Sequence, residues 1–174
     1  IYYMSRSLIN EGDVVICEAP SFLGSIVALE AVGAEVHSIS MDNEGIDLNR
    51  LAEKVKRLRD ANKVIKFIYT IPDFQNPTGI TMSYKRRREL LQFCEAEGIL
   101  IMEDNPYSRL RFRGEEQPTL LRIAQTELNN PYLVTEIVSF SKILGPGIRV
   151  AYAIGAPELI TKMVSWQQKV TISP

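Results

Sequence analysis

The sequence has few of the residues that build metal sites, disulfide frameworks or histidine-based catalytic centres. It contains one histidine, His37, and two cysteines among 174 residues. A single histidine argues against a histidine-rich metal site and against a Ser-His-Asp triad, so we expect no bound metal. Cys17 and Cys94 lie far apart in apolar segments. We expect two buried free thiols in a reducing compartment, which favours a cytoplasmic protein.

Long apolar runs and an excess of one charge are also missing. No apolar run approaches the roughly 18 residues of a membrane span, and the first ten residues do not resemble a signal peptide. The 20 basic and 21 acidic residues give a formal net charge of −1, so we expect neither a membrane nor a nucleic-acid partner. The one basic run, 85–88, is interpreted as a solvated helix face. A hydrophobic content of 45% fits one globular domain with a sizeable core.

Strand-like and helix-like segments alternate along the chain. The best-marked helix has Ser83 as its N-cap and Gly98 as its stop signal. The alternation predicts an α/β fold of three layers, in which a mixed, mostly parallel sheet is flanked by helices. Strand-like runs occupy 13–19, 35–40, 64–70, 98–104, 132–140 and 150–155, and helical periodicity occupies 22–32, 47–60, 83–97 and 157–170.

The last two predicted strands differ from the others in their connection. Only a short turn around 145–147, Gly-Pro-Gly, separates the strand ending near Phe140 from the one starting near Val150. Parallel neighbours need a crossover of about a dozen residues. If these two strands pair, we therefore expect them to be antiparallel, which makes the sheet mixed.

Polar side chains follow three of the predicted parallel strands. In open α/β sheets, ligands bind beyond the carboxyl ends of the strands. The order of the segments places Asn76, Asp104, Tyr107 and Lys142 at one such edge. Each residue alone also fits a turn, a cap or a solvated side chain. Their convergence on one edge instead favours a binding site.

These residues also carry a resemblance to a known family. The motifs are "NPTG" at 76–79, "EDNPY" at 103–107, "SFSK" at 139–142, and an arginine seven residues later, Arg149. In order and spacing they resemble the fold-type-I, class I/II aminotransferases that use pyridoxal 5'-phosphate. The closest subgroup is that of the 2-aminoadipate, kynurenine and aromatic aminotransferases. The resemblance runs from "EGDVVICEAPSFLG" to "VAYAIGAPELI", which is nearly the whole chain.

The resemblance implies catalytic roles for three residues. Lys142 matches the lysine that attacks the cofactor aldehyde and later shuttles the α-proton of the substrate. Asp104 matches the carboxylate that keeps the pyridine nitrogen protonated. Tyr107, together with Asn76, matches the pair that hydrogen-bonds the phenolate oxygen of the cofactor.

Three further residues match cofactor-binding positions of the family. Arg149 and Ser139 match the phosphate-binding arginine and serine, and a guanidinium suits a pair of phosphate oxygens. Phe22 matches the aromatic residue that stacks on the cofactor ring. In relatives this residue is often tyrosine, and phenylalanine keeps the stacking but donates no hydrogen bond.

The resemblance also implies a division into domains. Residues 1–174 match an incomplete large domain that binds the cofactor. The N-terminal phosphate loop and the C-terminal small domain, with its substrate-binding arginine, are expected outside this segment. Taken alone, the segment is therefore expected to bind the cofactor weakly and to be weakly active or inactive, and the whole protein is expected to be a homodimer.

The function implied is amino-group transfer from an amino acid to a 2-oxo acid such as 2-oxoglutarate. Two alternatives share the same motifs. One is an aminotransferase-like effector domain of a DNA-binding transcription regulator. The other is a lyase or decarboxylase on the same scaffold, because the chemistry of the cofactor depends on which substrate bond stands perpendicular to its ring.

Overall fold

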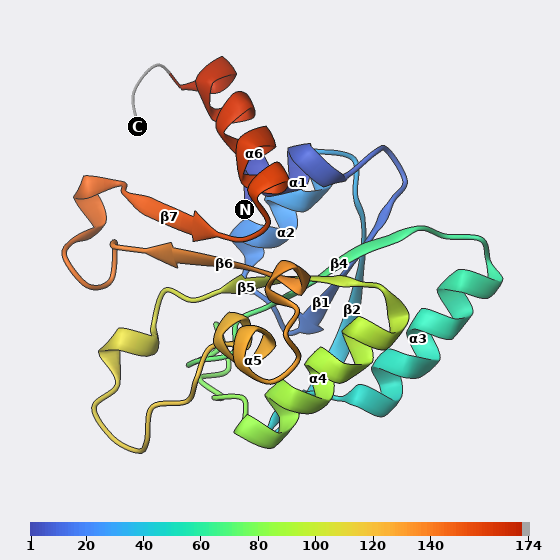
Figure 1. Cartoon of the computed structure of the whole chain (residues 1–174), viewed down its shortest axis with the longest axis horizontal. Coiled ribbons are helices and arrows are strands. Elements are labelled where there is room, and N and C mark those ends of the chain that lie inside the picture. Colours follow the sequence, from blue (N-terminus) through green and yellow to red (C-terminus); the bar gives the residue numbers. More distant parts are fainter. Residues whose placement is uncertain (172–174) are drawn as a thin grey trace.

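The computed structural model describes residues 1–171, in which a seven-stranded sheet lies between two layers of helices (Figure 1). The strand order is β3-β2-β1-β4-β5-β6-β7. The expected three-layer α/β fold is confirmed. The strands are β1 (Val14–Ala19), β2 (Glu35–Asp42), β3 (Gly45–Ile46), β4 (Ile65–Thr70), β5 (Leu100–Asp104), β6 (Val134–Ser139) and β7 (Ala151–Ile154). The α-helices are α1 (Tyr2–Leu8), α2 (Leu23–Glu30), α3 (Leu48–Asp60), α4 (Tyr84–Glu97), α5 (Leu120–Thr126) and α6 (Pro157–Val170).

The sheet is mixed, as its connections predict. Strands β2, β1, β4, β5 and β6 are parallel neighbours. Strand β7 pairs antiparallel with β6, with Ser139 opposite Ala151. The segment 140–150 between them is too short for a crossover, which forces this reversal. Strand β3, which the sequence did not reveal, adds a second antiparallel pairing at the other edge.

The two faces of the sheet carry separate apolar cores. Val14 and Ile16 of β1 face the layer of α3, α4 and α5, whereas Val15 and Cys17 face the layer of α1, α2 and α6. All four residues are buried, because helices cover both faces of the sheet (Figure 1). This double coverage explains the near-continuous apolar strands. Cys17 and Cys94 are buried free thiols, as expected.

The helix boundaries follow local signals where those signals are strong. The Ser83 side chain accepts a hydrogen bond from the Arg86 backbone N–H at the start of α4, and Gly98 ends α4 with a φ of 64°. Helix α5 was not predicted because it has only seven residues. Its signals are a Thr119 N-cap and a short apolar stripe. Helix α1, also of seven residues, starts at the beginning of the chain.

The interpretation of the basic run 85–88 as a solvated face is wrong for two of its four residues. The Arg87 side chain is completely buried and the Arg86 side chain is 12% exposed. Arg87 lies three residues before Leu90 and therefore on the apolar face of α4. Its buried guanidinium donates hydrogen bonds to backbone carbonyl oxygens and forms an ion pair with a carboxylate. Only Lys85 and Arg88 project into solvent.

Two classes of feature are absent from the described part of the chain. None of the helices within residues 1–171 is long and apolar enough to cross a membrane. The same residues contain no group of three or more histidine, cysteine, aspartate or glutamate side chains arranged to hold a metal ion.

Candidate active site

The carboxyl ends of β4, β5 and β6 lie side by side at one edge of the sheet. These parallel strands end at Thr70, Asp104 and Ser139. Each is followed by a segment without regular strand structure, 71–83, 105–119 and 140–150, respectively. The sequence-predicted residues therefore reach this edge from three separate parts of the chain, as their positions after consecutive strands require.

Three of the predicted residues lie close together. The Asn76 side-chain amide donates to the Tyr107 hydroxyl at an Nδ2–Oη distance of 3.4 Å. The Lys142 amine lies 6.0 Å from the centre of the Tyr107 ring. Lys142 is exposed, in the turn that follows β6. An amide, a phenol and an amine are thus available to one small molecule at this edge.

Asp104 is the acidic member of this edge. It is the last residue of β5, is 9% exposed, and accepts a hydrogen bond of 2.7 Å from the Tyr69 hydroxyl. Burial raises the pKa of Asp104, and the hydrogen bond from Tyr69 partly opposes that shift. Burial and the neighbouring Asp104 also raise the pKa of Tyr69, so Tyr69 remains a neutral donor. A cationic N–H beside Asp104 would relieve the cost of its buried charge.

A second buried carboxylate, which sequence reasoning missed, anchors the loop that carries Asn76. Glu18 accepts hydrogen bonds from the Thr70 hydroxyl and, at 3.2 Å, from the Ile71 backbone N–H. Its third donor is the side-chain amide of Gln75, at 3.3 Å. Burial raises the pKa of Glu18 to about 7 against these hydrogen bonds. The available signal was a glutamate near the end of an otherwise apolar strand, four residues before Phe22.

Replacing Glu18 with glutamine is expected to change the pH dependence of the free energy of unfolding. The folded-state pKa, about 7, exceeds the ordinary glutamate value of 4.5, so the folded state binds more protons between these values. This contribution therefore makes the natural protein less stable as pH rises from about 4.5 to about 7. The glutamine variant lacks the contribution and gains stability relative to the natural protein over that range. Urea unfolding at about pH 5 and pH 8 measures the difference.

The control for this prediction is Glu115→Gln, because Glu115 is exposed in the segment between β5 and α5. Its stability relative to the natural protein should be the same at both pH values. An equally constant difference for Glu18→Gln would show that the Glu18 carboxyl does not titrate as the structure indicates.

Phe22 lies at the start of α2, where it is 40% exposed. Its ring packs directly over Gly24, since a Cβ added at that glycine would come within 2.6 Å of the ring. Only glycine leaves room for this ring position without a shift. The ring is therefore partly exposed to solvent, and its exposed surface can stack on a planar ligand.

Ser139 and Arg149 lie at the two ends of the connection between β6 and β7. The Ser139 hydroxyl accepts from the Ser141 backbone N–H at 3.2 Å and is partly exposed at the end of β6. Arg149 is exposed, has a φ of 51°, and lines a hollow of about 590 Å³ bordered by β7 and α6. Within the described residues, Arg149 makes no hydrogen bond or ion pair to Asn76, Tyr107 or Lys142. The structure brings the latter three together directly.

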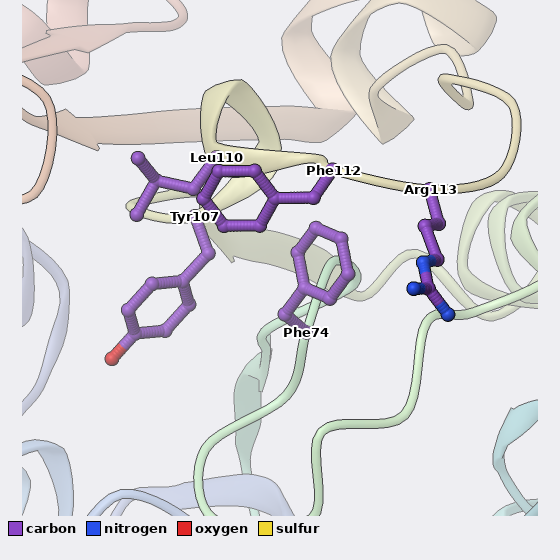
Figure 2. A pocket seen from close by; sticks show the side chains of 5 residues that line it. All are labelled: Phe74, Tyr107, Leu110, Phe112 and Arg113. Carbon is purple, nitrogen blue, oxygen red and sulfur yellow. The ribbon is translucent and has the colours of Figure 1, made fainter.

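An apolar pocket of about 420 Å³ adjoins Tyr107 (Figure 2). The Phe74 ring, from the loop after β4, faces side chains from the segment after β5 (Figure 2). The Tyr107 hydroxyl points away from the Phe74 ring, so the phenol contributes its ring to the pocket and its oxygen to the contact with Asn76. The pocket is lined by Phe74, Tyr107, Leu110, Phe112 and Arg113.

The chain is similar over nearly its whole length to known aminotransferases. The family model "Aminotransferase class I and II" matches residues 1–174. The aromatic-amino-acid aminotransferase 1 of Thermococcus litoralis is 38% identical over 97% of this chain and 39% of its own length. The crystal structure of the alpha-aminoadipate aminotransferase LysN from Thermus thermophilus, complexed with N-(5'-phosphopyridoxyl)-L-leucine, has a TM-score of 0.90 and 35% identity. That match covers 98% of this chain and 42% of LysN.

A further relative is named as a transcriptional regulator and not as an aminotransferase. It is the uncharacterized HTH-type transcriptional regulator YisV of Bacillus subtilis, 31% identical over 92% of this chain. The match covers 31% of the regulator. The chain therefore spans well under half the length of each of these three proteins.

Proposed function

Because the chain belongs to the aminotransferase class I and II family, we propose that the protein transfers an amino group from an amino acid to a 2-oxo acid, with pyridoxal 5'-phosphate as its cofactor. The observation that carries this proposal is the gathering of Asn76, Tyr107 and Lys142 at the sheet edge where β5 ends in the buried Asp104. We further propose that residues 1–174 form part of the large, cofactor-binding domain, and that the activity belongs to the whole protein.

The side chains at this edge fit the chemical groups of the cofactor. Asp104 is a buried carboxylate to which Tyr69 donates, and it suits a protonated ring nitrogen because a cation nearby would offset its desolvation. The donor atoms of Asn76 and Tyr107 lie 3.4 Å apart, a separation at which both can donate to one phenolate oxygen. The exposed amine of Lys142 is accessible to an aldehyde.

Each of these residues then has a distinct task. When bound, the cofactor supplies an electron sink that stabilises negative charge at the α-carbon of the substrate. Lys142 Nζ would hold the cofactor and would accept the α-proton of the amino acid. Asp104 holds the proton on the ring nitrogen, and Asn76 and Tyr107 hold the phenolate oxygen in its anionic form.

We assign the remaining cofactor contacts to Phe22, Ser139 and Arg149. The ring of Phe22, fixed over Gly24, stacks on the cofactor ring. The Ser139 hydroxyl and the Arg149 guanidinium bind the phosphate, which a planar fork of N–H donors suits. Arg149 is exposed and is free to turn toward a phosphate.

The names of the relatives guide the proposed substrates and setting. The names of the aromatic-amino-acid aminotransferase and of LysN support an aromatic or long-chain amino acid as the amino donor. We propose 2-oxoglutarate as the amino acceptor. We also propose a cytoplasmic homodimer. The free thiols of Cys17 and Cys94 favour a reducing compartment. The exposed apolar side chains of Leu23 and Val27 on α2, 70% and 55% exposed, favour burial against further protein.

Mixing the full-length protein, loaded with pyridoxal phosphate, with candidate amino acids tests the proposed reaction. A donor amino acid is expected to bleach the visible band of the bound cofactor within seconds, and added 2-oxoglutarate is expected to restore it. Absorbance spectroscopy follows both half-reactions, and chromatography identifies the 2-oxo acid and the glutamate formed. Release of ammonia or carbon dioxide, with a band that persists or recovers without added 2-oxoglutarate, would instead indicate a lyase or decarboxylase.

A second candidate function rests on the similarity to YisV. In that case the same site binds the cofactor to control a DNA-binding segment elsewhere in the protein. Full-length protein that binds the cofactor and a specific DNA duplex, but produces no 2-oxo acid from any amino acid, would support the regulator and refute the enzyme.

A further inference from the structure

A buried ion cluster lies immediately behind the candidate site. Asp73, whose side chain is 1% exposed, contacts two guanidinium groups. Arg87 Nη2 lies 2.9 Å from one carboxylate oxygen and Arg111 Nη2 lies 2.6 Å from the other. Arg87 comes from α4, whereas Arg111 follows the short 3₁₀ helix after β5. The cluster therefore ties together three segments that are separate in the sequence.

The position of this cluster relative to the site is specific. Asp73 lies three residues before Asn76, and Arg111 lies four residues after Tyr107. The loop after β4 and the segment after β5 are thus joined twice. One joint is the Asn76–Tyr107 contact of 3.4 Å at the site, and the other is the Asp73–Arg111 ion pair behind it.

Phe74 connects the two joints. The guanidinium carbon of Arg111 lies 4.7 Å from the centre of the Phe74 ring, within the range of a cation–π contact. Phe74 has a φ of 50°, which is uncommon for a residue with an aromatic side chain, so neighbouring contacts must hold it there. Its ring faces the pocket that Tyr107 also lines (Figure 2).

We propose that Arg111 is a positioning residue, which sets the distance between Asn76 and Tyr107 by holding Asp73 and Phe74. The proposal rests on the proposed function, in which both side chains donate to one oxygen of the cofactor. A small displacement of either donor weakens that shared hydrogen bonding, because hydrogen bonds depend steeply on distance and angle.

Arg87 is not equivalent to Arg111 in this cluster. Its guanidinium donates to the backbone oxygens of Met82, Pro72 and Pro118 as well as contacting Asp73, so it holds the fold of the loop itself. Arg111 has Asp73 as its hydrogen-bond acceptor. Removing Arg111 leaves Asp73 paired with Arg87, so the buried carboxylate keeps a counter-charge and the fold is expected to survive.

The test compares Arg111→Met with Arg109→Met in the full-length protein loaded with pyridoxal phosphate. Methionine keeps an unbranched apolar stem beneath Phe74 but removes the ion pair. Arg109 is the matched control, because its side chain is 69% exposed and pairs with Glu116 at the surface. Three quantities are measured for each variant: the dissociation constant of the cofactor, the pH midpoint of its visible band, and the kcat and KM of amino transfer.

For Arg111→Met we expect the cofactor dissociation constant to rise about tenfold and kcat to fall about tenfold, with little change in KM. The pH midpoint of the band is expected to rise by about half a unit or more. Fewer hydrogen bonds leave more negative charge on the phenolate oxygen, which then favours the nearby proton. Arg109→Met should match the natural protein in all three quantities. Arg111→Lys keeps the charge without the planar contact and should give a smaller rise of the midpoint.

The outcomes separate this inference from the proposed function. If the natural full-length protein binds no pyridoxal phosphate, both are refuted. If it binds the cofactor but Arg111→Met behaves like Arg109→Met, the positioning role alone is refuted. If Arg111→Met fails to fold, the Arg111→Lys midpoint decides, and an unchanged midpoint overturns the proposal.

Discussion

Replacing Lys142 with alanine is expected to lower kcat for amino transfer by a factor of about 10³ or more, because the proposed function makes one amine both the nucleophile and the proton carrier. The fold should be nearly unaffected. Lys142 is exposed in the turn after β6 and forms no ion pair with an acidic side chain among residues 1–171. Its removal is therefore expected to change the free energy of unfolding by about 0.5 kcal/mol or less.

Two measurements check this prediction. Steady-state assays of the full-length protein give kcat, and absorbance spectroscopy reports whether the lysine-linked band of the cofactor is lost. Lys162→Ala on α6 is a suitable control, since Lys162 is also exposed and lies outside the candidate site. A Lys142→Ala variant that kept a tenth or so of the natural kcat would assign the amine to another residue.

The second large effect is expected for Asp104→Asn, with kcat falling by a factor of about 10² to 10³. Asparagine has nearly the same shape but no charge, so it could not perform the proposed role of keeping the cofactor ring nitrogen protonated. At pH values above the ordinary aspartate pKa of 3.8, the cofactor-free variant should be at least as stable as the natural protein, because burial raises the pKa of Asp104 and the neutral amide removes the cost of that charge. Tyr69 can still donate to the amide oxygen.

This opposite movement of activity and stability distinguishes a role in catalysis from a purely structural one. Kinetic assays and urea unfolding of the cofactor-free protein measure the two quantities. Asp60→Asn, at an exposed position in the last turn of α3, should change neither by much. If Asp104→Asn kept its activity within a factor of about three, the assigned role of Asp104 would be wrong.

The fold was predictable where one physical rule dominates. Apolar strands separated by helical segments require a parallel sheet covered on both faces, and the short segment 140–150 requires the antiparallel β6–β7 pair. Short elements escaped prediction because seven residues give too few turns for a clear period, as in α5, and because two residues give none, as in β3. Their presence depends on packing against elements distant in sequence.

The candidate site was predictable to a similar extent. Residues that follow consecutive parallel strands must reach the same edge, which brings Asn76, Tyr107 and Lys142 together. Which charged residues lie behind them was not predictable from order alone. Arg87 belongs to a basic run typical of a solvated face, and only its spacing from Leu90 shows that it points inward.

The contact of Asp73 with Arg111 joins residues 38 positions apart and has no local signal in the sequence. The partners of a buried charge depend on which loops meet, and loop contacts are decided by tertiary packing. The same holds for Glu18, whose carboxylate is satisfied by the Gln75 side chain 57 residues away.

The most direct test of the claim that these residues form one cofactor site is to locate the covalent link between protein and cofactor. Full-length protein saturated with pyridoxal phosphate is reduced with borohydride, digested, and analysed by mass spectrometry. We predict that the pyridoxyl group is found on the peptide containing Lys142. A label on a different lysine, such as Lys66 of β4, or a saturated protein that yields no labelled peptide, would contradict the assignment of this sheet edge as the cofactor site.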